Sequence, residues 1–520
     1  MQFGIAPLTS AAVYDGGVTA WERLTALDAS FLGLEDERTP MHVGAVVICD
    51  AGPLETEDGG IDFDKLCRFF ESTLAIKERY RQRVEWIPGL GHPVWVDDEH
   101  FNIFYHVRHV ALPRPGDERQ LKRLAGRVFS QRLDRTRPLW EAWVVEGLSE
   151  HRFALVVKIH HAMIDGVAGV DLMTSLFRGT PDDSIAKVTI PEPRPRPNRR
   201  EMLSAELDHR AKGSREILDK IGDVIRDPKG WWEGARDTAE GIASTIISGL
   251  APASKSPLNP KRIGPNRRFD FARFDLAKVK EVKSALGGKL NDVVLATACG
   301  AVTRFLDRRG VDLAELVDFR ALVPVSVRKT SERGAGGNKV GMMLANLPVQ
   351  ERDVERRFQL ICEMMNYLKT QSHQVESTTA LEELADKTAA GLVRSMARIA
   401  GRQRAYNLVV TNVPGPPFPM YLLGGRIREL YPLVPLISTQ ALGLALFSYD
   451  GSLFWGLNAD WQEMPDLHEF AEDLEASFAE LAELALGPAE TAPAKSSANS
   501  QSEPRVGVSM PPTAQRRKTE

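Results

Sequence analysis

Cysteine is scarce in this sequence, and its four copies lie far apart. No CxxC pair and no zinc-like cysteine–histidine spacing occurs among Cys49, Cys67, Cys299 and Cys362. Disulfide-stabilised folds and structural zinc sites place their cysteines in such pairs and clusters. We therefore expect neither feature, and we interpret the four residues as small buried side chains.

The sequence also lacks an excess of basic residues. Its 66 Lys and Arg are balanced by 70 Asp and Glu, which leaves a formal net charge of −4. A chain that binds nucleic acid usually carries a basic field that attracts phosphate groups. The composition therefore predicts no nucleic-acid partner.

Long apolar runs are missing as well. No stretch approaches the roughly 20 residues that span a bilayer. Residues 1–17 have no charged region ahead of an apolar core, as a secretory signal would have. These absences predict a cytoplasmic protein, which could still rest on a membrane surface.

Changes in composition divide the chain into five parts. With 520 residues it is too long for one hydrophobic core. The proline- and arginine-rich stretch IPEPRPRPNRR is extended, and we interpret 190–268 as a connection with helices of its own. It separates an N-terminal domain, 21–189, from a C-terminal domain, 269–486. We interpret 1–20 as a loose leader and 487–520, which has no periodicity, as a disordered tail.

Strands and helices are intermixed in both domains. Apolar runs predict strands and 3.6-residue spacing predicts helices. The predicted strands are 42–49, 101–110, 153–159, 269–274, 321–327, 341–349, 406–411, 440–449 and 453–459. The predicted helices are 62–80, 118–131, 167–177, 201–225, 291–306, 352–371, 381–399 and 466–486. Asp450-Gly451 is a hairpin signal. The pattern predicts the α/β (mixed α+β) class, with a mixed sheet and helices in each domain.

The most informative segment is HHAMIDG at 160–166, where a predicted buried strand ends. Histidine titrates nearest neutrality, so it can take up and return a proton during a reaction. Neighbouring strand side chains point to opposite faces, so only one of His160 and His161 can face a given cavity. Asp165 can cap the helix that follows, and Gly166 relieves the turn.

The same residues have other interpretations. His160 and His161 could be ordinary core or surface histidines, and with Asp165 they could bind a metal ion. Diverging side chains and the lack of a further ligand cluster argue against a metal. Asp165 could be a helix cap with no wider role, which is compatible with a functional motif.

The segment fits HHxxxDG, the signature of CoA-dependent acyltransferases related to chloramphenicol acetyltransferase and to peptide-synthetase condensation domains. Further segments narrow the resemblance: LDASFL near the N-terminus, PMHVG at 40–44, RPLWE at 137–141, NDVVLA at 291–296, VPVSVR at 323–328, GNKVG at 337–341 and NVPGPP at 412–417. In this order they resemble the bacterial wax ester synthase/acyl-CoA:diacylglycerol acyltransferase family over about residues 22–486.

The resemblance implies two chloramphenicol-acetyltransferase-like domains with an active-site tunnel between them. It makes His161 the general base that deprotonates an acceptor hydroxyl, which then attacks the thioester of a long-chain acyl-CoA. His160 and Asp165 would hold the loop, and Gly166 would allow close substrate approach. Acyl-CoA is the implied co-substrate, with no metal and no other cofactor.

The implied acceptor is diacylglycerol, and the product is triacylglycerol. A fatty alcohol as acceptor, giving a wax ester, is one alternative, and a non-catalytic lipid-binding or droplet-coating protein is another. A lipid substrate also favours a peripheral position at the inner membrane face or on lipid droplets.

The resemblance further places the pair Asn291-Asp292 beside the tunnel. At the start of a helix, the Asn291 amide and free backbone N–H groups could polarise a carbonyl oxygen. The alternative is that Asn291 only caps the helix.

Overall fold

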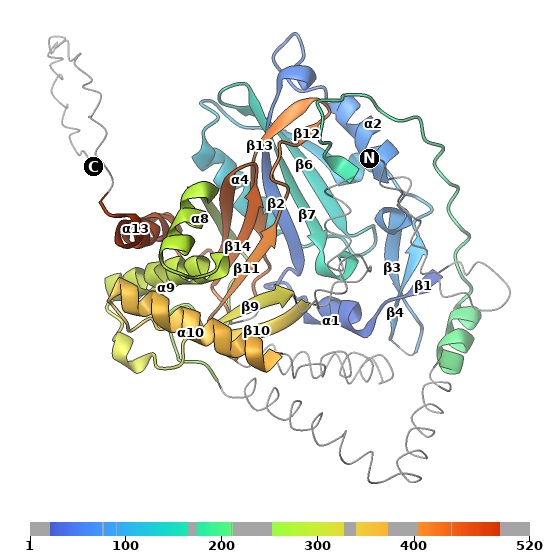
Figure 1. The fold of residues 1–520 in the computed structure, drawn as a ribbon. Coiled ribbons are helices and arrows are strands. Elements are labelled where there is room, and N and C mark those ends of the chain that lie inside the picture. The colour runs from blue at the N-terminus through green and yellow to red at the C-terminus, as the bar shows by residue number, and fades with distance from the viewer. Residues whose placement is uncertain are drawn as a thin grey trace, which may run out of the picture.

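Two six-stranded sheets form the framework of the computed structural model (Figure 1). The structure describes residues 21–74, 77–89, 91–164, 173, 175–209, 211, 252–326, 340–372, 404–437 and 439–488. A smaller sheet has the order β1-β4-β3 and consists of β1 (Trp21–Arg23), β4 (Pro93–Asp97) and β3 (Gln82–Trp86). The predicted mixed α/β class is confirmed.

The first large sheet carries the histidine motif on a central strand. Its order is β12-β13-β2-β7-β6-β5, in which β5 and β6 are parallel and the other pairs are antiparallel. Its strands are β12 (Tyr421–Leu422), β13 (Gly425–Leu433), β2 (His42–Asp50), β7 (Arg152–His160), β6 (Trp140–Leu148) and β5 (Val107–Ala111). β7 is almost entirely buried, which explains its nearly continuous apolar sequence.

The second large sheet has the order β10-β9-β11-β14-β15-β8. Its strands are β10 (Val340–Asn346), β9 (Arg320–Ser326), β11 (Leu408–Pro414), β14 (Leu442–Tyr449), β15 (Ser452–Asp460) and β8 (Arg267–Asp275). β11 is parallel to β9 and to β14, and the other pairs are antiparallel. The predicted hairpin is confirmed, because Asp450 and Gly451 have φ angles of 42° and 79° between paired Tyr449 and Ser452.

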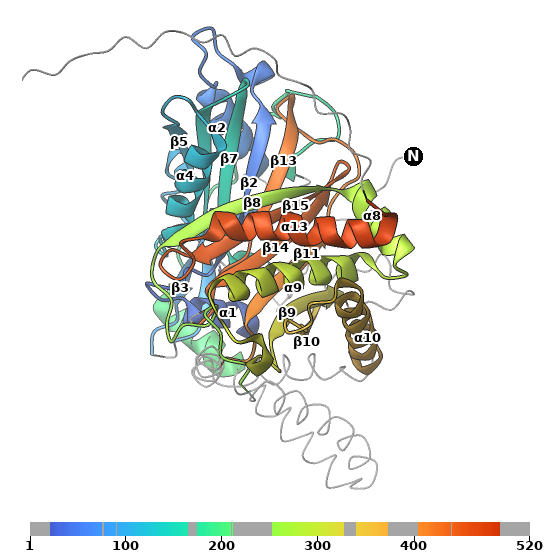
Figure 2. The ribbon, with the colours of Figure 1, turned by 90° about the vertical axis from the view of Figure 1, so that its left-hand side faces the viewer.

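Four of the described helices cover one face of the second sheet, as Figures 1 and 2 show together. They are α8 (Leu276–Ala285), α9 (Leu290–Arg308), α10 (Val354–Ser372) and α13 (Leu467–Leu486). α9 is buried from Asp292 to Thr303, because it packs against the other three helices. An apolar sequence on all sides is what such a position requires.

Further helices lie in the N-terminal half of the described chain. They are α1 (Ala26–Leu34), α2 (Phe63–Leu74), α3 (Ile103–His106) and α4 (Glu118–Ser130). Single turns of 3-10 helix occur at η1 (Gly52–Leu54), η2 (Glu78–Arg81), η3 (His161–Met163) and η4 (Leu313–Glu315). Residues 199–209 are also helical. Among the described residues, no helix combines the length and apolar character that crossing a membrane requires.

The C-terminal half completes the first sheet. β13 runs antiparallel to β2, with Leu433 opposite Gly44 and Ile427 opposite Cys49. β13 also crosses the second sheet closely, since a Cβ atom on Gly456 would lie 1.7 Å from the carbonyl oxygen of Pro432. Glycine is therefore required where the two sheets meet.

Some predicted elements differ from the structure. The strand predicted at 101–110 is wrong in its first half, because the Asn102 side chain accepts the Phe104 N–H at 3.0 Å and starts α3. The helix predicted at 62–80 is too long, because α2 ends at Leu74. Strands β12 and β13 were not predicted, although the glycine pair in YLLGGR marks their turn.

Several predictions lie outside the described residues. These are the leader, the helix at 381–399, nearly all of the tail and most of the helices at 167–177 and 201–225. The domain boundaries and the tunnel between the halves stay predictions.

Candidate active site

His160 ends β7 and is completely buried, with 0% exposure. Its Nδ1 accepts a hydrogen bond from the Ala162 N–H at 3.1 Å, so the neutral ring carries its proton on Nε2. This atom lies 3.7 Å from Oε1 of Glu35. Burial, followed by the charges of Arg135 and His161, lowers the pKa of His160 to about 3. The ring is therefore neutral near physiological pH, and its Nδ1 is occupied by the hydrogen bond within the turn.

His161 begins η3 and has a different environment. The residue is only partly buried. Its backbone N–H donates to the carbonyl oxygen of Met41 at 2.8 Å, and its ring stacks on Phe31 of α1 with centroids 4.0 Å apart. These contacts fix the ring between the start of β2 and α1.

Burial is also the largest influence on the protonation of His161. It lowers the pKa of the ring, and the residue's own backbone carbonyl oxygen opposes this in part. Nδ1 is buried and, within the described ranges, has no hydrogen-bond partner. In the tautomer that carries its proton on Nδ1, Nε2 is the basic nitrogen of the neutral ring.

Asp165 and Gly166 lie outside the described residues. Their predicted roles in the loop, including the helix cap at Asp165, stay predictions.

An ion pair with a buried carboxylate supports the histidine turn, and no sequence pattern predicted it. Oε2 of Glu35 lies 2.9 Å from Nε and 2.7 Å from an η-nitrogen of Arg135. Oε1 of Glu35 accepts the Met41 N–H at 3.2 Å. One carboxylate therefore joins α1, the start of β2 and His160. Only the position of the two residues could have indicated this pair, because Glu35 follows the last residue of LDASFL by three positions and Arg135 precedes the first residue of RPLWE by two.

The RPLWE segment serves packing in the described structure. Trp140 is 2% exposed and its indole N–H donates to the carbonyl oxygen of Tyr80 at 2.8 Å. The carbonyl oxygen of Leu139 accepts the backbone N–H of His160 at 2.9 Å. This segment therefore fixes the end of β7 from its other edge.

Asn291 lies inside α9 rather than at its cap. The helix begins at Leu290 with Lys289 as the N-cap residue, so the interpretation of Asn291 as a plain cap is wrong. Its Oδ1 accepts a hydrogen bond at 2.9 Å from Nδ2 of Asn412 in the NVPGPP segment. The amide nitrogen of Asn291 makes no hydrogen bond within the described residues and is left as a donor.

Asp292 is 3% exposed and closes the first turn of α9. Its Oδ2 accepts the Lys289 N–H at 2.8 Å, with Sγ of Cys362 at 3.6 Å. Oδ1 is buried and has no hydrogen-bond partner in the described part of the chain. The Asp292 side chain therefore stabilises the start of α9, the role that the alternative interpretation of the sequence gave to Asn291.

The structure thus forms two groups from the predicted site residues. His160 and His161 share one turn, Asn291 and Asp292 share another, and no hydrogen bond or ion pair among the described residues joins the groups. Among the residues that the structure describes, no cluster of three or more histidine, cysteine or acidic side chains could hold a metal ion.

Comparisons with known proteins cover most of the chain. The family model of the wax ester synthase/diacylglycerol acyltransferase catalytic domain matches residues 24–294, and the model of the WS/DGAT C-terminal domain matches 336–482. Two probable diacylglycerol O-acyltransferases of Mycobacterium tuberculosis are each 32% identical, over 470 and 468 residues. These alignments cover 88% and 87% of this chain and 95% and 97% of the relatives.

Solved structures agree with this result. The wax ester synthase/diacylglycerol acyltransferase from Marinobacter aquaeolei VT8 superposes with a TM-score of 0.62 at 26% identity, covering 89% of this chain and 99% of that one. The first condensation domain of the calcium-dependent antibiotic synthetase has a TM-score of 0.53 at 18% identity, over 89% of this chain and 98% of its own, and shares the fold. The chain belongs to the wax ester synthase/diacylglycerol acyltransferase family.

Proposed function

We propose that this protein transfers a long-chain acyl group from acyl-CoA to the free hydroxyl of diacylglycerol, which gives triacylglycerol and CoA. The names of the two mycobacterial relatives support diacylglycerol as the acceptor. The observation that carries the chemistry is the contrast between the histidines, since His160 is fully buried and His161 remains partly exposed.

His161 is the general base in this proposal. Its lowered pKa keeps the ring neutral near pH 7, so Nε2 can remove the proton of the acceptor hydroxyl. The oxygen then attacks the thioester carbonyl carbon, and the tetrahedral intermediate collapses as the carbon–sulfur bond breaks. The CoA thiolate takes the proton back from the imidazolium. The acyl group is never attached to the enzyme, so no serine or cysteine nucleophile is needed.

The other motif residues have supporting roles. His160, Asp165 and Gly166 hold the turn that carries His161. The hydrogen bond from Asn412 occupies the Asn291 oxygen, which leaves the Asn291 N–H₂ group to polarise the thioester carbonyl and stabilise the developing oxyanion. Asp292 fixes the start of α9. Acyl-CoA is the only cofactor-like molecule in this scheme.

The proposed location is the cytoplasm, with a peripheral position at the inner membrane face or on lipid droplets. Diacylglycerol is held in membranes, so the enzyme has to collect it at such a surface. Wax ester formation from a fatty alcohol is a second candidate, because the similar Marinobacter protein is named a wax ester synthase.

The test incubates purified protein with labelled long-chain acyl-CoA, diacylglycerol and hexadecanol, and measures released CoA and both ester products. We expect triacylglycerol as the main product. His161→Ala should lower kcat by about 100-fold to 10,000-fold, the usual contribution of a general base. The exposed His100 provides a matched control, and His100→Ala should retain activity.

Three results would change the proposal. Predominant wax ester would reassign the acceptor. Full activity in His161→Ala would remove the base from the mechanism. Binding of lipid without any ester product would indicate a lipid-binding protein.

A further inference from the structure

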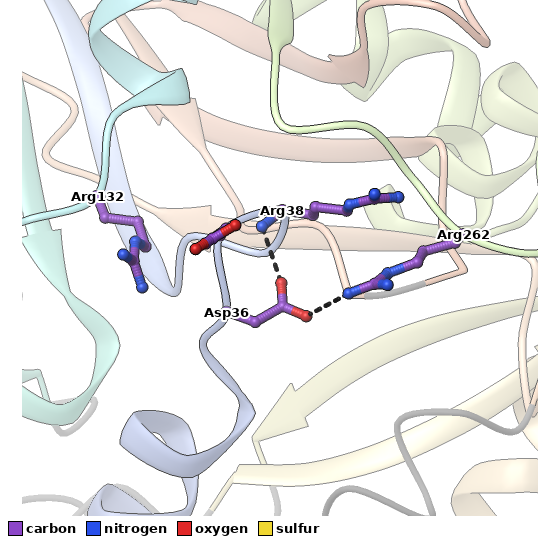
Figure 3. Close-up of a pocket in the computed structure, with 5 residues that line it drawn as sticks. Asp36, Arg38, Arg132 and Arg262 are labelled. Carbon is purple, nitrogen blue, oxygen red and sulfur yellow. Dashed lines mark hydrogen bonds and ion pairs between the residues drawn. The ribbon is translucent and has the colours of Figure 1, made fainter.

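A charged pocket is lined partly by the residues that follow Glu35, the carboxylate beside His160, and it has no role in the chemistry described above. It has a volume of about 400 Å³ and is lined by Asp36, Glu37, Arg38, Arg132 and Arg262. Figure 3 shows that these side chains come from three separate segments. They are the loop between α1 and β2, the residues after α4 and the segment that leads into β8.

The charges in this pocket are not balanced. Asp36 is engaged by Arg262 at 3.2 Å and by the backbone N–H of Arg38 at 2.8 Å (Figure 3). Partial burial opposes ionisation of Asp36, but these hydrogen bonds outweigh it and lower its pKa. Within the described residues, the guanidinium groups of Arg38 and Arg132 have no ion-pair partner. Two cations therefore remain against the one carboxylate of Glu37.

The backbone that carries the two free arginines is held in place. An η-nitrogen of Arg267 donates to the carbonyl oxygen of Arg38. The Nζ atom of buried Lys158 donates at 2.9 Å to the carbonyl oxygen of Gln131, the neighbour of Arg132. The binding groups are thus set on anchored segments, which reduces the entropy lost when a ligand binds.

The pocket adjoins the proposed base through short stretches of chain. Arg38 is three residues from Met41, whose carbonyl oxygen accepts the His161 N–H. Three extended residues span at most about 11 Å. Asp36 follows Glu35, which lies 3.7 Å from His160. A ligand in the pocket therefore lies within reach of the reacting groups by a flexible arm.

We propose that this pocket binds phosphate groups of the CoA part of the donor, with Arg38 and Arg132 as the anion-binding residues. The inference rests on the proposed use of acyl-CoA. A guanidinium group matches two phosphate oxygens at once, and phosphate carries the multiple negative charge that the pocket lacks. The pantetheine arm, with two amide units between diphosphate and thiol, is long enough to carry the thioester from this pocket to His161.

The decisive test compares two donors in the double variant Arg38→Gln/Arg132→Gln. The donors are long-chain acyl-CoA and the corresponding S-acyl pantetheine, which has no phosphate. We expect the KM for acyl-CoA to rise about 10-fold or more, the effect of losing one to two charge-assisted hydrogen bonds. The KM for S-acyl pantetheine and the KM for diacylglycerol should stay at the wild-type values.

The matched control is Arg123→Gln, which removes an exposed arginine on α4 outside the pocket. It should change no KM. Both pocket side chains are exposed, so the double variant should keep the thermal midpoint of the wild type. An equal rise in KM for both donors, or no rise for acyl-CoA, overturns the proposal.

Two further measurements distinguish CoA from a lipid headgroup as the bound phosphate. They also distinguish a failure of this proposal from a failure of the proposed function. Titration calorimetry with free CoA needs no turnover, and the double variant should bind CoA about 10-fold more weakly. If the wild type forms no ester, the proposed function is wrong. The CoA titration still tests whether Arg38 and Arg132 bind CoA. Binding to phosphatidylcholine vesicles with and without phosphatidate tests a lipid headgroup. Loss of the phosphatidate preference alone, with unchanged CoA affinity, overturns the assignment to CoA.

Discussion

Replacing Glu35 by glutamine should damage both the stability and the turnover of the enzyme. The carboxylate side chain is 1% exposed and faces donors on both oxygens, Arg135 at 2.7 Å and the Met41 N–H at 3.2 Å. A glutamine side chain has one oxygen, so in either orientation its NH₂ group faces another donor. The substitution also leaves the guanidinium group of Arg135 without its counterion.

The size of the effect follows from burial. Breaking a fully buried ion pair costs about 3–5 kcal/mol. The Arg135 side chain keeps 32% of its exposure, so water solvates part of the uncompensated charge. We therefore expect a loss of about 2–3 kcal/mol in the free energy of unfolding. It would be measured as a lower urea midpoint in tryptophan fluorescence.

Catalysis should fall because Glu35 positions the turn that carries the base. A displacement of His161 by a fraction of an ångström should reduce kcat about 10-fold. The KM for acyl-CoA should not change, because the carboxylate does not line the charged pocket. This difference between kcat and KM separates positioning from donor binding.

The matched control is Glu22→Gln. Glu22 pairs with Arg79 at 2.6 Å but is 63% exposed, so its loss should cost no more than about 1 kcal/mol and leave kcat unchanged. Equal stability and equal kcat in the two variants would refute the role assigned to Glu35.

Two further predictions concern acid stability and the contact between the sheets. His160 has a pKa of about 3 in the folded protein against 6.5 when unfolded, so the unfolded chain takes up the proton first as the pH falls. The stability it contributes is complete above pH 6.5 and should decrease by about 2 kcal/mol by pH 5, and a urea midpoint that is constant over this range would contradict the burial of the ring. Gly456→Ala should destabilise the fold by more than about 3 kcal/mol, because its Cβ atom would meet the Pro432 carbonyl oxygen at 1.7 Å. Gly52→Ala, where the structure leaves open space, is the control, and equal thermal midpoints of the two variants would disprove the close crossing.

Much of the architecture followed from local patterns. The apolar run at 153–159 predicted β7, the spacing at 118–131 predicted α4, and Asp450-Gly451 predicted the β14–β15 hairpin. These elements are encoded by residues near one another in the chain, so periodicity and turn chemistry are sufficient. Residues 421–433 were missed because β13 pairs over most of its length with β2, almost 400 residues away, and only its first residues pair with the neighbouring two-residue strand β12.

The sequence by itself determined which reactive residues this protein has, namely the paired histidines at the end of a strand, and which family its motifs indicate. Tertiary structure decided which of these residues is accessible and which side chains surround it. The choice between His160 and His161 depends on Glu35, Ala162 and Phe31 around the rings. The pairing of Asn291 with Asn412 and the gathering of Arg38, Arg132 and Arg262 also join distant segments. Such contacts depend on strand register and on the packing of the two sheets, which no local pattern of residues specifies.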